Sequence, residues 1–290
     1  MKQKTLIMGV SYFLLFSLFF FIVMAWIARV GFDPAGDTGE QIALIRIEGV
    51  IMQSDEITDL LTRSRDNDRI KAILLRIDSP GGAVVPAQEI YEAVLKIRES
   101  GVKKVVTSMG TVAASGGYYI ASASNFIMAN PGTLTGSLGV IMELMNVEGL
   151  LSKVGVEQMT IKSGANKDVG SPFRAMTDEE RSILQNVSDD IHEQFIDAVA
   201  EGRSLPVEGI RRLADGRVFT GRQAKAVGLV DGIGSFEDAI QKTADIAGIK
   251  GKPRVIETQN KLSFFKMVQT KLFGAVSYFS PMKFYYLLSF

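Results

Sequence analysis

Three short runs of apolar, mostly β-branched residues constrain this chain most strongly, because segments with helical periodicity separate them. The apolar runs are residues 42–50, 70–77 and 102–107, and the helical segments between them are 55–66 and 85–98. Strands that alternate with amphipathic helices are typical of a mostly parallel sheet whose crossover helices cover its faces. The sequence therefore predicts an α/β fold, to which residues 126–129 add a short strand.

The N-terminus carries an uncharged and almost wholly apolar stretch, Leu6–Ala28. This stretch is long enough to cross a bilayer as a helix, and Lys2 and Lys4 precede it. Because the basic side of such a helix stays in the cytoplasm, we predict a single-pass cell-membrane anchor with the rest of the chain on the extracytoplasmic side. A cleavable signal peptide is the alternative, but the stretch is long for one and Ala25–Arg29 is a poor cleavage site.

Compositional shifts predict four segments: an anchor at 1–29, a linker at 30–40, a folded domain at 41–257 and a tail at 258–290. The tail contains four lysines, nine aromatic residues and no acid. Interleaved aromatic and basic residues suit a segment that lies on membrane lipid. They equally suit a tail that packs against a neighbouring subunit, and the sequence leaves both interpretations open.

The charge balance and the shortage of metal-binding side chains exclude several classes of function. Lys and Arg together number 32, and Asp and Glu also number 32, so no net positive field attracts nucleic acid. With no cysteine and one histidine, the chain has no disulfide, no thiol nucleophile and no Cys/His zinc site. Glycine-rich loops that bind ATP or NAD are also missing. We therefore expect no cofactor and no metal.

Ser115 stands where a nucleophile is expected in such a fold. It follows an apolar strand and the small residues Gly110–Ala114, and Gly116 begins the next helical segment. A serine at a tight strand-to-helix turn exposes its hydroxyl beside free backbone N–H groups. The alternative is an ordinary helix N-cap, a position that serine favours.

A second turn supplies backbone donors for such a nucleophile. The predicted strand at 70–77 leads into Asp78–Gly82, where Gly81 and Gly82 allow a substrate backbone to approach closely. An oxyanion hole requires two N–H groups that converge on one point. We predict one donor from the turn at Gly81 and Gly82 and the other from Gly116.

The residue types leave the general base undecided. The single histidine, His192, falls inside a long helix predicted at Thr177–Glu201 and is expected to pack or to face solvent there. A lysine can act as the base where burial favours its neutral form. Lys162 and Lys167 lie in a Gly/Ser-rich loop after a predicted strand, and their spacing alone does not choose between them. The alternative is that both are solvated loop lysines.

Six motifs follow one another along the predicted domain. They are Arg76–Gly82, Met109–Tyr119, Pro131–Val140, Lys162–Pro172, Thr220–Ala224 and Gly228–Asp231. Together they resemble the signal peptide peptidase A family of membrane-anchored serine peptidases, over roughly residues 42–234. A single domain of this length is similar to the half-size form of that family.

The resemblance implies a fold related to the Clp protease and crotonase group, built from repeated β-β-α units. It also implies a Ser/Lys dyad, in which Ser115 is the nucleophile and Lys167 is the general base. Family members form ring- or dome-shaped homo-oligomers, such as an octamer, in which the lysine can come from the adjacent protomer. Their implied substrates are peptides, in particular remnant signal peptides. From position alone, Ser137 or Ser171 is a candidate to orient the lysine.

Three other functions share parts of this pattern. A crotonase-type acyl-CoA enzyme uses similar turns, but it needs neither Ser115 nor Lys167 and would lie away from its cytosolic cofactor. A catalytically inactive membrane scaffold has no need of these two residues. A membrane peptidase that cuts stomatin-like proteins would differ only in its substrate.

Overall fold

The computed structural model describes residues 12–24, 40–258 and 285–287. The chain divides into two compact units, Met1–Gly39 and Glu40–Phe290. In the first unit, residues 12–24 form a helix with mostly exposed side chains. No helix within the described ranges is both long and apolar enough to span a membrane. The remaining residues of the predicted anchor lie outside the described ranges.

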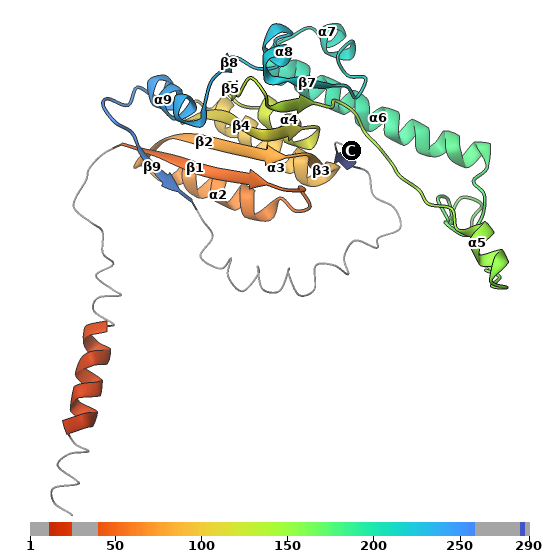
Figure 1. Cartoon of the computed structure of the whole chain (residues 1–290), viewed down its shortest axis with the longest axis horizontal. Helices are drawn as coiled ribbons and strands as arrows, with labels where there is room; N and C mark the ends of the chain where they lie inside the picture. Colours follow the sequence, from red (N-terminus) through yellow and green to blue (C-terminus); the bar gives the residue numbers. More distant parts are fainter. Residues whose placement is uncertain (1–11, 25–39, 259–284, 288–290) are drawn as a thin grey trace, which may run out of the picture. The chain divides into compact units, whose positions relative to one another are not determined.

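A mostly parallel sheet forms the centre of the second unit (Figure 1). Its strands are β1 (Gln41–Glu48), β2 (Ile70–Ser79), β4 (Lys104–Ala114), β5 (Phe126–Ala129), β6 (Leu134–Gly136), β7 (Val218–Thr220), β8 (Gly232–Ile233) and β9 (Arg254–Glu257). The order is β7-β6-β4-β2-β1-β9, and β5 bridges β4 and β8. Only β6 and β7 pair antiparallel, so the predicted parallel α/β architecture is confirmed. A separate two-stranded sheet joins β3 (Gly81–Ala83) to β10 (Tyr285–Leu287), and most of the predicted tail lies outside the described ranges.

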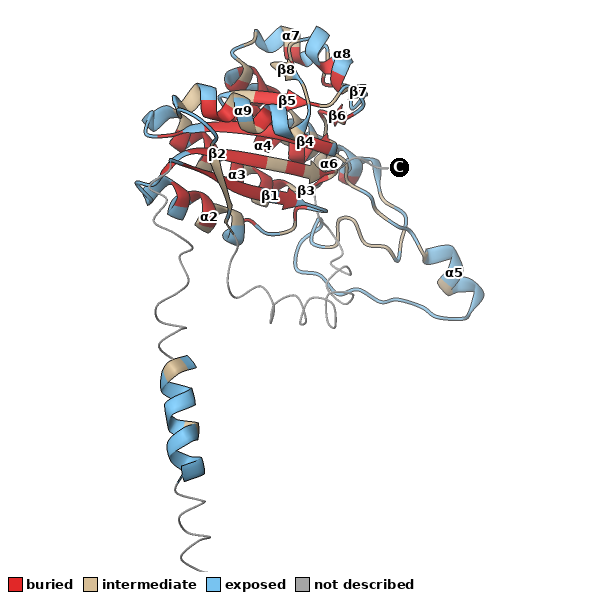
Figure 2. Ribbon diagram, turned by 60° about the vertical axis from the view of Figure 1, so that its left-hand side comes forward, coloured by how far each residue is buried: buried red, intermediate tan, exposed pale blue. Residues whose placement is uncertain are grey.

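Helices cover both faces of the main sheet, which explains why most positions of β1 and β2 are buried (Figure 2). The helices are α2 (Asp55–Asp66), α3 (Val84–Ser100), α4 (Gly116–Ser122), α5 (Glu148–Lys153), α6 (Asp178–Arg203), α7 (Val207–Arg211), α8 (Gly221–Ala226) and α9 (Phe236–Ala247). Along β1, Ala43 and Ile45 join the larger core with α2, α3, α4 and α6. The intervening Ile42 and Leu44 join a smaller core with α9.

Several predicted elements have the expected bounds. The helix α2 and the strand β5 match their predicted ranges, and α6 begins with the predicted capping box. In that box, Glu180 N donates to Thr177 Oγ1 at 3.2 Å, and Thr177 N donates to the Glu180 carboxylate at 3.0 Å. These reciprocal bonds satisfy two of the free N–H groups at the helix start.

Residues 141–177, which we call the arm, differ from the rest of the second unit. The arm carries α5 and extends away from the packed layers (Figures 1 and 2). None of its residues is buried, and its exposed side chains include Met145, Leu150, Val154, Met159 and Ile161. The strand predicted ahead of the lysine loop is wrong, because residues 156–162 have no regular structure. No strand of the described residues lies beside this segment, so its backbone has no partner for the hydrogen bonds of a sheet.

Candidate active site

Ser115 lies at the end of β4, in a strained turn before α4. Its φ and ψ angles are 52° and −119°, a backbone region that residues with a side chain rarely adopt. The residue is fully buried, and its Oγ has no hydrogen-bond partner in the described chain. Ser115 thus occupies the N-cap position without capping the helix. A buried, unpartnered hydroxyl at a strained strand-to-helix turn is typical of a nucleophile.

The neighbouring strand β6 holds this turn in place. Ser115 N donates to Gly136 O at 2.8 Å, and Thr135 Oγ1 donates to Ala113 O at 2.6 Å. Both partners belong to β6, which pairs in parallel with the last three residues of β4. The strained conformation of Ser115 persists because these contacts fix Ser115 itself and the residues just before it.

A bulge in β4 aligns the turn at Ser115 with the end of β2. The register between the two strands shifts after Ile77, so that Ser79 lies opposite Ala113. The Asp78 carboxylate accepts a hydrogen bond from Val112 N at 3.0 Å and so ties the extra residues of β4 to β2. The turn after β2 therefore lies level with the residues that precede the nucleophile.

Three glycines were predicted to supply the oxyanion donors, and their hydrogen bonds differ. The N–H of Gly116 makes no hydrogen bond within the described chain. The N–H of Gly81 donates to Ser79 Oγ at 3.1 Å and is therefore already satisfied. Gly82 lies between residues that bond to Ile51, so its own N–H faces the opposite edge of β3. The geometry favours Gly82 and Gly116 as the pair of donors.

Close backbone contacts keep these two candidate donors near Ser115. The helix α4 contacts both β2 and β3. A Cβ atom added to Gly117 would lie 3.0 Å from Ser79 O, and one added to Gly82 would lie 2.0 Å from Ile51 O. Only glycine allows backbones to approach this closely, which explains the Gly-Gly pairs on both sides of the site.

The two candidate lysines differ in the contacts of their side-chain amines. The Nζ of Lys162 donates to Asp168 Oδ1 at 2.6 Å and to Ala165 O at 2.7 Å. Lys167 is exposed, and its Nζ makes no hydrogen bond or ion pair within the described chain. A carboxylate partner stabilises the charged ammonium, whereas an unpaired amine can become a base once water is removed. The contacts therefore distinguish two residues that their spacing left equivalent.

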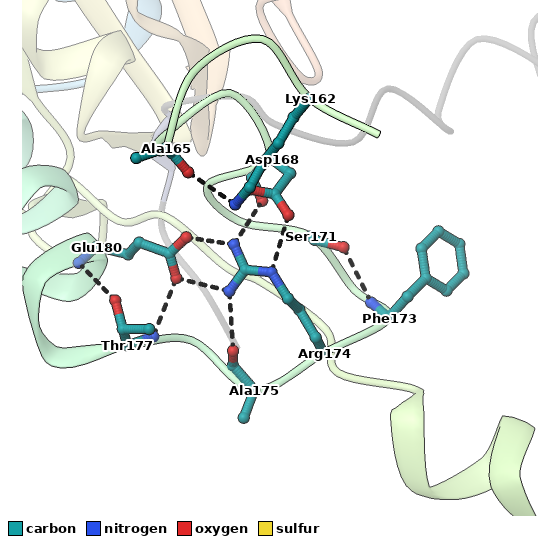
Figure 3. A network of polar contacts seen from close by, with 9 residues as sticks. All are labelled: Lys162, Ala165, Asp168, Ser171, Phe173, Arg174, Ala175, Thr177 and Glu180. Carbon is teal, nitrogen blue, oxygen red and sulfur yellow. Dashed lines mark hydrogen bonds and ion pairs between the residues drawn. The ribbon is translucent and has the colours of Figure 1, made fainter. Parts of the chain in front are cut away.

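Arg174 ties the lysine loop to the start of α6 (Figure 3). Its Nε donates to Asp168 Oδ2 at 2.9 Å, and its Nη1 donates to Glu180 Oε2 at 2.8 Å. Hydrogen bonds from Arg174 and then from Thr177 N lower the pKa of Glu180 to about 2. Arg174, with a smaller contribution from Lys162, also holds the pKa of Asp168 well below its usual value. Both carboxylates are therefore charged at neutral pH and give the arm an internal framework.

The two serines considered as lysine orienters lie in different regions. Ser137 is buried, has a φ angle of 51° and directly follows Gly136, the hydrogen-bond acceptor of Ser115 N. Ser171 belongs to the arm, where its Oγ accepts a hydrogen bond from Phe173 N at 3.3 Å. Each serine therefore lies in the same region as only one member of the predicted dyad.

His192 lies within α6, as predicted. Its Nε2 is buried without a hydrogen-bond partner in the described chain, and the same is true of Ser115 Oγ. No hydrogen bond joins the two, so His192 is not positioned as the base of Ser115. Five of the predicted site residues lie where β2, β4 and β6 end, in a region that we call the corner: Gly81, Gly82, Ser115, Gly116 and Ser137. The other two, Lys167 and Ser171, lie in the arm.

Three residues whose side chains hold parts of the candidate site in place were not identified from the sequence: Asp78, Thr135 and Arg174. The partners of Asp78 and Thr135 are 34 and 22 residues away along the chain, a separation at which sequence patterns say nothing of side-chain contacts. Both acidic partners of Arg174 lie 6 residues away. An arginine midway between two acids was the one local signal that could have revealed its role.

Two family models match the folded unit. The model of peptidase family S49 matches residues 97–250, and the Clp protease model matches residues 41–132. The chain belongs to peptidase family S49. The S49 match includes both Ser115 and Lys167, and the Clp protease match is consistent with the parallel α/β architecture.

Similar proteins carry the names of proteases. The protein slr0021 of Synechocystis sp., named as a protease, is 47% identical over 73% of this S49 chain and 76% of its own length. Protease 4 of Salmonella typhi is 36% identical over 84% of this chain and 41% of its own length. The chloroplastic serine protease SPPA of Arabidopsis thaliana is 34% identical over 69% of this chain and 32% of its own length. The chain is therefore a serine peptidase, although it spans less than half of the two longer relatives.

Proposed function

We propose that the chain is an ATP-independent endopeptidase in which Ser115 is the nucleophile and Lys167 is the general base. The observation that carries this proposal is the buried, unpartnered Oγ of Ser115 at a strained turn. The free N–H of Gly116 beside it and the edge-facing N–H of Gly82 support an oxyanion hole. The S49 match gives the reaction as peptide hydrolysis.

The proposed reaction has two stages. Neutral Lys167 takes the proton of the Ser115 hydroxyl while Oγ attacks the peptide carbonyl, and the amine leaving group receives that proton. The N–H groups of Gly82 and Gly116 stabilise the oxyanion, each by about 3 kcal/mol. Water then attacks the acyl-enzyme with Lys167 again as the base, which releases the product acid and restores Ser115.

Lys167 reaches a nucleophile, in this proposal, when the arm packs against a neighbouring copy of the chain. Within one chain, no hydrogen bond joins Lys167 to Ser115, and the arm has no buried residue. Exposed Met159 and Ile161, at 89% and 95%, are side chains that an interface would cover. A groove of about 800 Å³ between the arm and α6 offers a surface for the second copy. Assembly would also remove water from Lys167 and favour its neutral form.

The predicted N-terminal anchor supports a proposal for the location of the chain and for its substrates. We propose that Leu6–Ala28 holds the catalytic unit at the extracytoplasmic face of the cell membrane. Apolar peptides that remain in the bilayer, such as cleaved signal peptides, are then the nearest substrates. An extended peptide would pair with β3, and its alternate side chains would enter pockets beside the strand.

A peptidase assay with matched lysine variants tests the proposal. The detergent-solubilised chain is incubated without ATP with a fluorogenic peptide that has an apolar residue before the cleaved bond. We expect hydrolysis by the wild type and by Lys162→Ala, and its loss in Ser115→Ala and Lys167→Ala. Activity that persists in Ser115→Ala would overturn the mechanism.

A mixing experiment tests the shared site. Combining inactive Ser115→Ala with inactive Lys167→Ala places an intact serine of one copy beside an intact lysine of another. Partial recovery of activity is expected if the dyad crosses between copies. No recovery, with both variants assembled to the wild-type size, would restrict the dyad to a single chain.

A further inference from the structure

The bulge in β4 sets how far the end of this strand extends past the end of β2. The last regular pair before the bulge joins Ile77 to Met109, and the next pair joins Ser79 to Ala113. One residue of β2 therefore faces three residues of β4, 110–112. At about 3.3 Å a residue, the two extra residues advance the end of β4 by up to about 7 Å relative to β2. The turn that carries the candidate nucleophile directly follows β4, so its position depends on the shape of the bulge.

Two side chains that the proposed reaction does not use bond to carbonyl groups at this bulge. Arg76 Nη1 donates to Met109 O at 2.9 Å, and Thr133 Oγ1 donates to Gly110 O at 2.7 Å. The Asp78 carboxylate, described above, holds the far end of the bulge. Because a bulge interrupts the regular ladder, bonds from side chains fix backbone groups whose positions the ladder no longer sets.

Other contacts hold the Arg76 side chain in place. Its Nη1 also donates to Ser108 Oγ at 2.8 Å, and its Cζ lies 5.1 Å from the centre of the Phe236 ring. Arg46 lies directly opposite in β1, and its Cζ is 5.9 Å from the centre of the same ring. The Nε of Arg46, however, donates to Glu257 on β9 at 2.9 Å. The two arginines therefore share a neighbouring ring and differ in the strand to which they bond, which makes Arg46 a matched control.

The hydroxyl of Thr133 links the bulge to the turn between β5 and β6. Thr133 is buried, and its Oγ1 accepts a hydrogen bond from Asn130 N at 3.1 Å while it donates to Gly110 O. A Cβ atom added to Gly110 would lie 2.6 Å from Asp78 Cγ, so the backbone of β4 passes close to that carboxylate. The backbone at Gly110 is thus in contact with two fixed side chains, which leaves it little freedom to shift.

We propose that Arg76 and Thr133 are positioning residues of the oxyanion hole. The inference rests on the proposed function, because it takes the N–H groups of Gly82 and Gly116 as the two donors. Gly82 follows β2 in the chain and Gly116 follows β4, so the bulge sets the distance between the donors. Arg76 and Thr133 act through the bulge, which they hold in the form that places Ser115 and Gly116 level with Gly82.

The effect of losing either side chain should depend on the state of the substrate. A tetrahedral adduct carries a full negative charge on the oxygen that faces the donors, whereas a ground-state ligand does not. A donor that is displaced by a fraction of an ångström therefore weakens the binding of the adduct more than that of the ground-state ligand. A side chain that only stabilised the fold would leave the ratio of the two affinities unchanged.

A pair of inhibitors measures this ratio in one preparation of the detergent-solubilised full chain. Ser115 Oγ adds to the carbonyl carbon of a peptide aldehyde that ends in leucinal, with its proton passing to Lys167, whereas the matching leucinol peptide binds without reaction. A fluorescent form of the leucinol peptide is titrated directly, and the aldehyde is measured by its displacement. Arg76→Met should weaken aldehyde binding about 10- to 100-fold and alcohol binding less than about twofold. Both constants refer to the folded protein, so partial unfolding would not change their ratio.

Variants at both arginines show whether the bond to β4 is responsible. Arg76→Lys keeps a donor for Met109 O and should restore the ratio to within about fivefold of the wild type. Arg46→Met should leave the ratio unchanged, because that arginine bonds to β9. An equal change in Arg46→Met would overturn the role of Arg76, since the lost charge would then explain it. If Arg76→Met does not assemble to the wild-type size, Arg76→Gln takes its place, because the shorter side chain ends before Met109 O.

Thr133→Val tests the second carbonyl independently. It removes the hydroxyl that bonds to Gly110 O and keeps the branched shape of the side chain, so the preference for the aldehyde should fall about 10-fold. Thr133→Ser keeps the hydroxyl and should retain the wild-type ratio. A wild-type ratio in Thr133→Val would overturn the role of Thr133.

The wild type and Ser115→Ala separate this inference from the proposed function. The wild type should bind the aldehyde at least ~100-fold more tightly than the alcohol, and Ser115→Ala should lose that preference. No preference in the wild type would count against Ser115 as the nucleophile, and so against the proposed function itself. A preference that is present in the wild type and persists in both Arg76→Met and Thr133→Val would overturn the positioning role alone.

Discussion

The buried corner around Ser115 and the exposed arm around Lys167 are stabilised by different kinds of interaction. The corner holds a strained residue by strand pairing, by the hydrogen bond that Thr135 donates to Ala113 O and by the one that Asp78 accepts from Val112 N. The arm has no buried residue and keeps its form through the ion pairs of Arg174. A nucleophile, the role proposed for Ser115, needs exact placement, whereas a lysine supplied to another copy, as proposed for Lys167, must extend beyond its own core. The difference predicts that substitutions in the two regions will have different effects.

The largest effect is expected for Ser115→Ala, which should lower kcat/KM by a factor of about 10³ or more. The same change removes a buried hydroxyl that has no partner, so it should raise the free energy of unfolding by about 1 kcal/mol. Peptide hydrolysis and denaturant unfolding of the same preparations measure both quantities. A loss of stability would show that the hydroxyl has a structural role and would weaken the contrast between the two regions.

Lys167→Ala should follow, with a loss of about 10²- to 10⁴-fold in kcat. Lys162→Ala is the matched control, because it removes a lysine from the same loop that is held by Asp168. We expect the control to retain activity within about tenfold of the wild type, since this exposed ion pair contributes little. Steady-state kinetics distinguishes the two, and equal losses would assign the effect to the loop as a whole.

A smaller effect is expected for Asp78→Ala, which leaves Val112 N without its acceptor. The free energy of unfolding should fall by about 1–3 kcal/mol, and kcat should fall about 10- to 100-fold because the end of β4 shifts. Asp78→Asn keeps an acceptor oxygen and should restore most of both. As a control, Asp59→Ala removes a surface carboxylate of α2 and should change neither. A normal kcat in Asp78→Ala would show that the bulge does not position the nucleophile.

The sequence predicted the corner better than the arm, for a physical reason. Apolar runs and a capping box report burial and local hydrogen bonds, so α2, β5 and the start of α6 were predicted within their observed bounds. The strand β4 extends to Ala114, beyond its predicted end at Thr107, because pairing with β2 and β6 keeps its small residues extended. Local preference alone would have assigned those residues to a turn.

The arm was harder to predict because its residues lack partners within one chain. The segment before Ile161 has strand-forming residues, yet it forms no strand without a neighbour. Spacing left Lys162 and Lys167 equivalent and the family resemblance favoured Lys167, whereas the ion pair of Lys162 with Asp168 is a contact that spacing does not reveal. The pairing of β10 with β3 joins residues about 200 positions apart, and no periodic pattern reports such a contact. Tertiary contacts therefore supplied what the sequence left undecided.

Arg174→Gln should affect the arm alone. It removes the bonds that join Asp168 and Glu180, so amide exchange within the arm should rise about tenfold while the unfolding midpoint of the sheet changes little. Activity should fall less than in Lys167→Ala, because the base remains present but is less well placed. Hydrogen exchange by mass spectrometry checks the local effect. Uniform loss of protection across β1 and β2 would contradict the separation of the arm from the core.

The smallest effect is expected from acid, and its direction follows from Glu180. Its folded pKa of about 2 lies below the ordinary value of 4.5, so its contribution to stability is complete above pH 4.5 and is lost as the pH falls toward 2. Exchange in the arm, corrected for the intrinsic rate, should therefore rise between pH 4.5 and 2 in the wild type. In Glu180→Gln the rise should be smaller, because the carboxylate that titrates is absent. The corner is held mainly by strand pairing, and its one carboxylate contact, from Val112 N to Asp78, is not among the ion pairs of the described residues, so its exchange should change less over this range. An equal rise in both regions would mean that acid loosens the whole unit rather than the ion pairs that distinguish the arm.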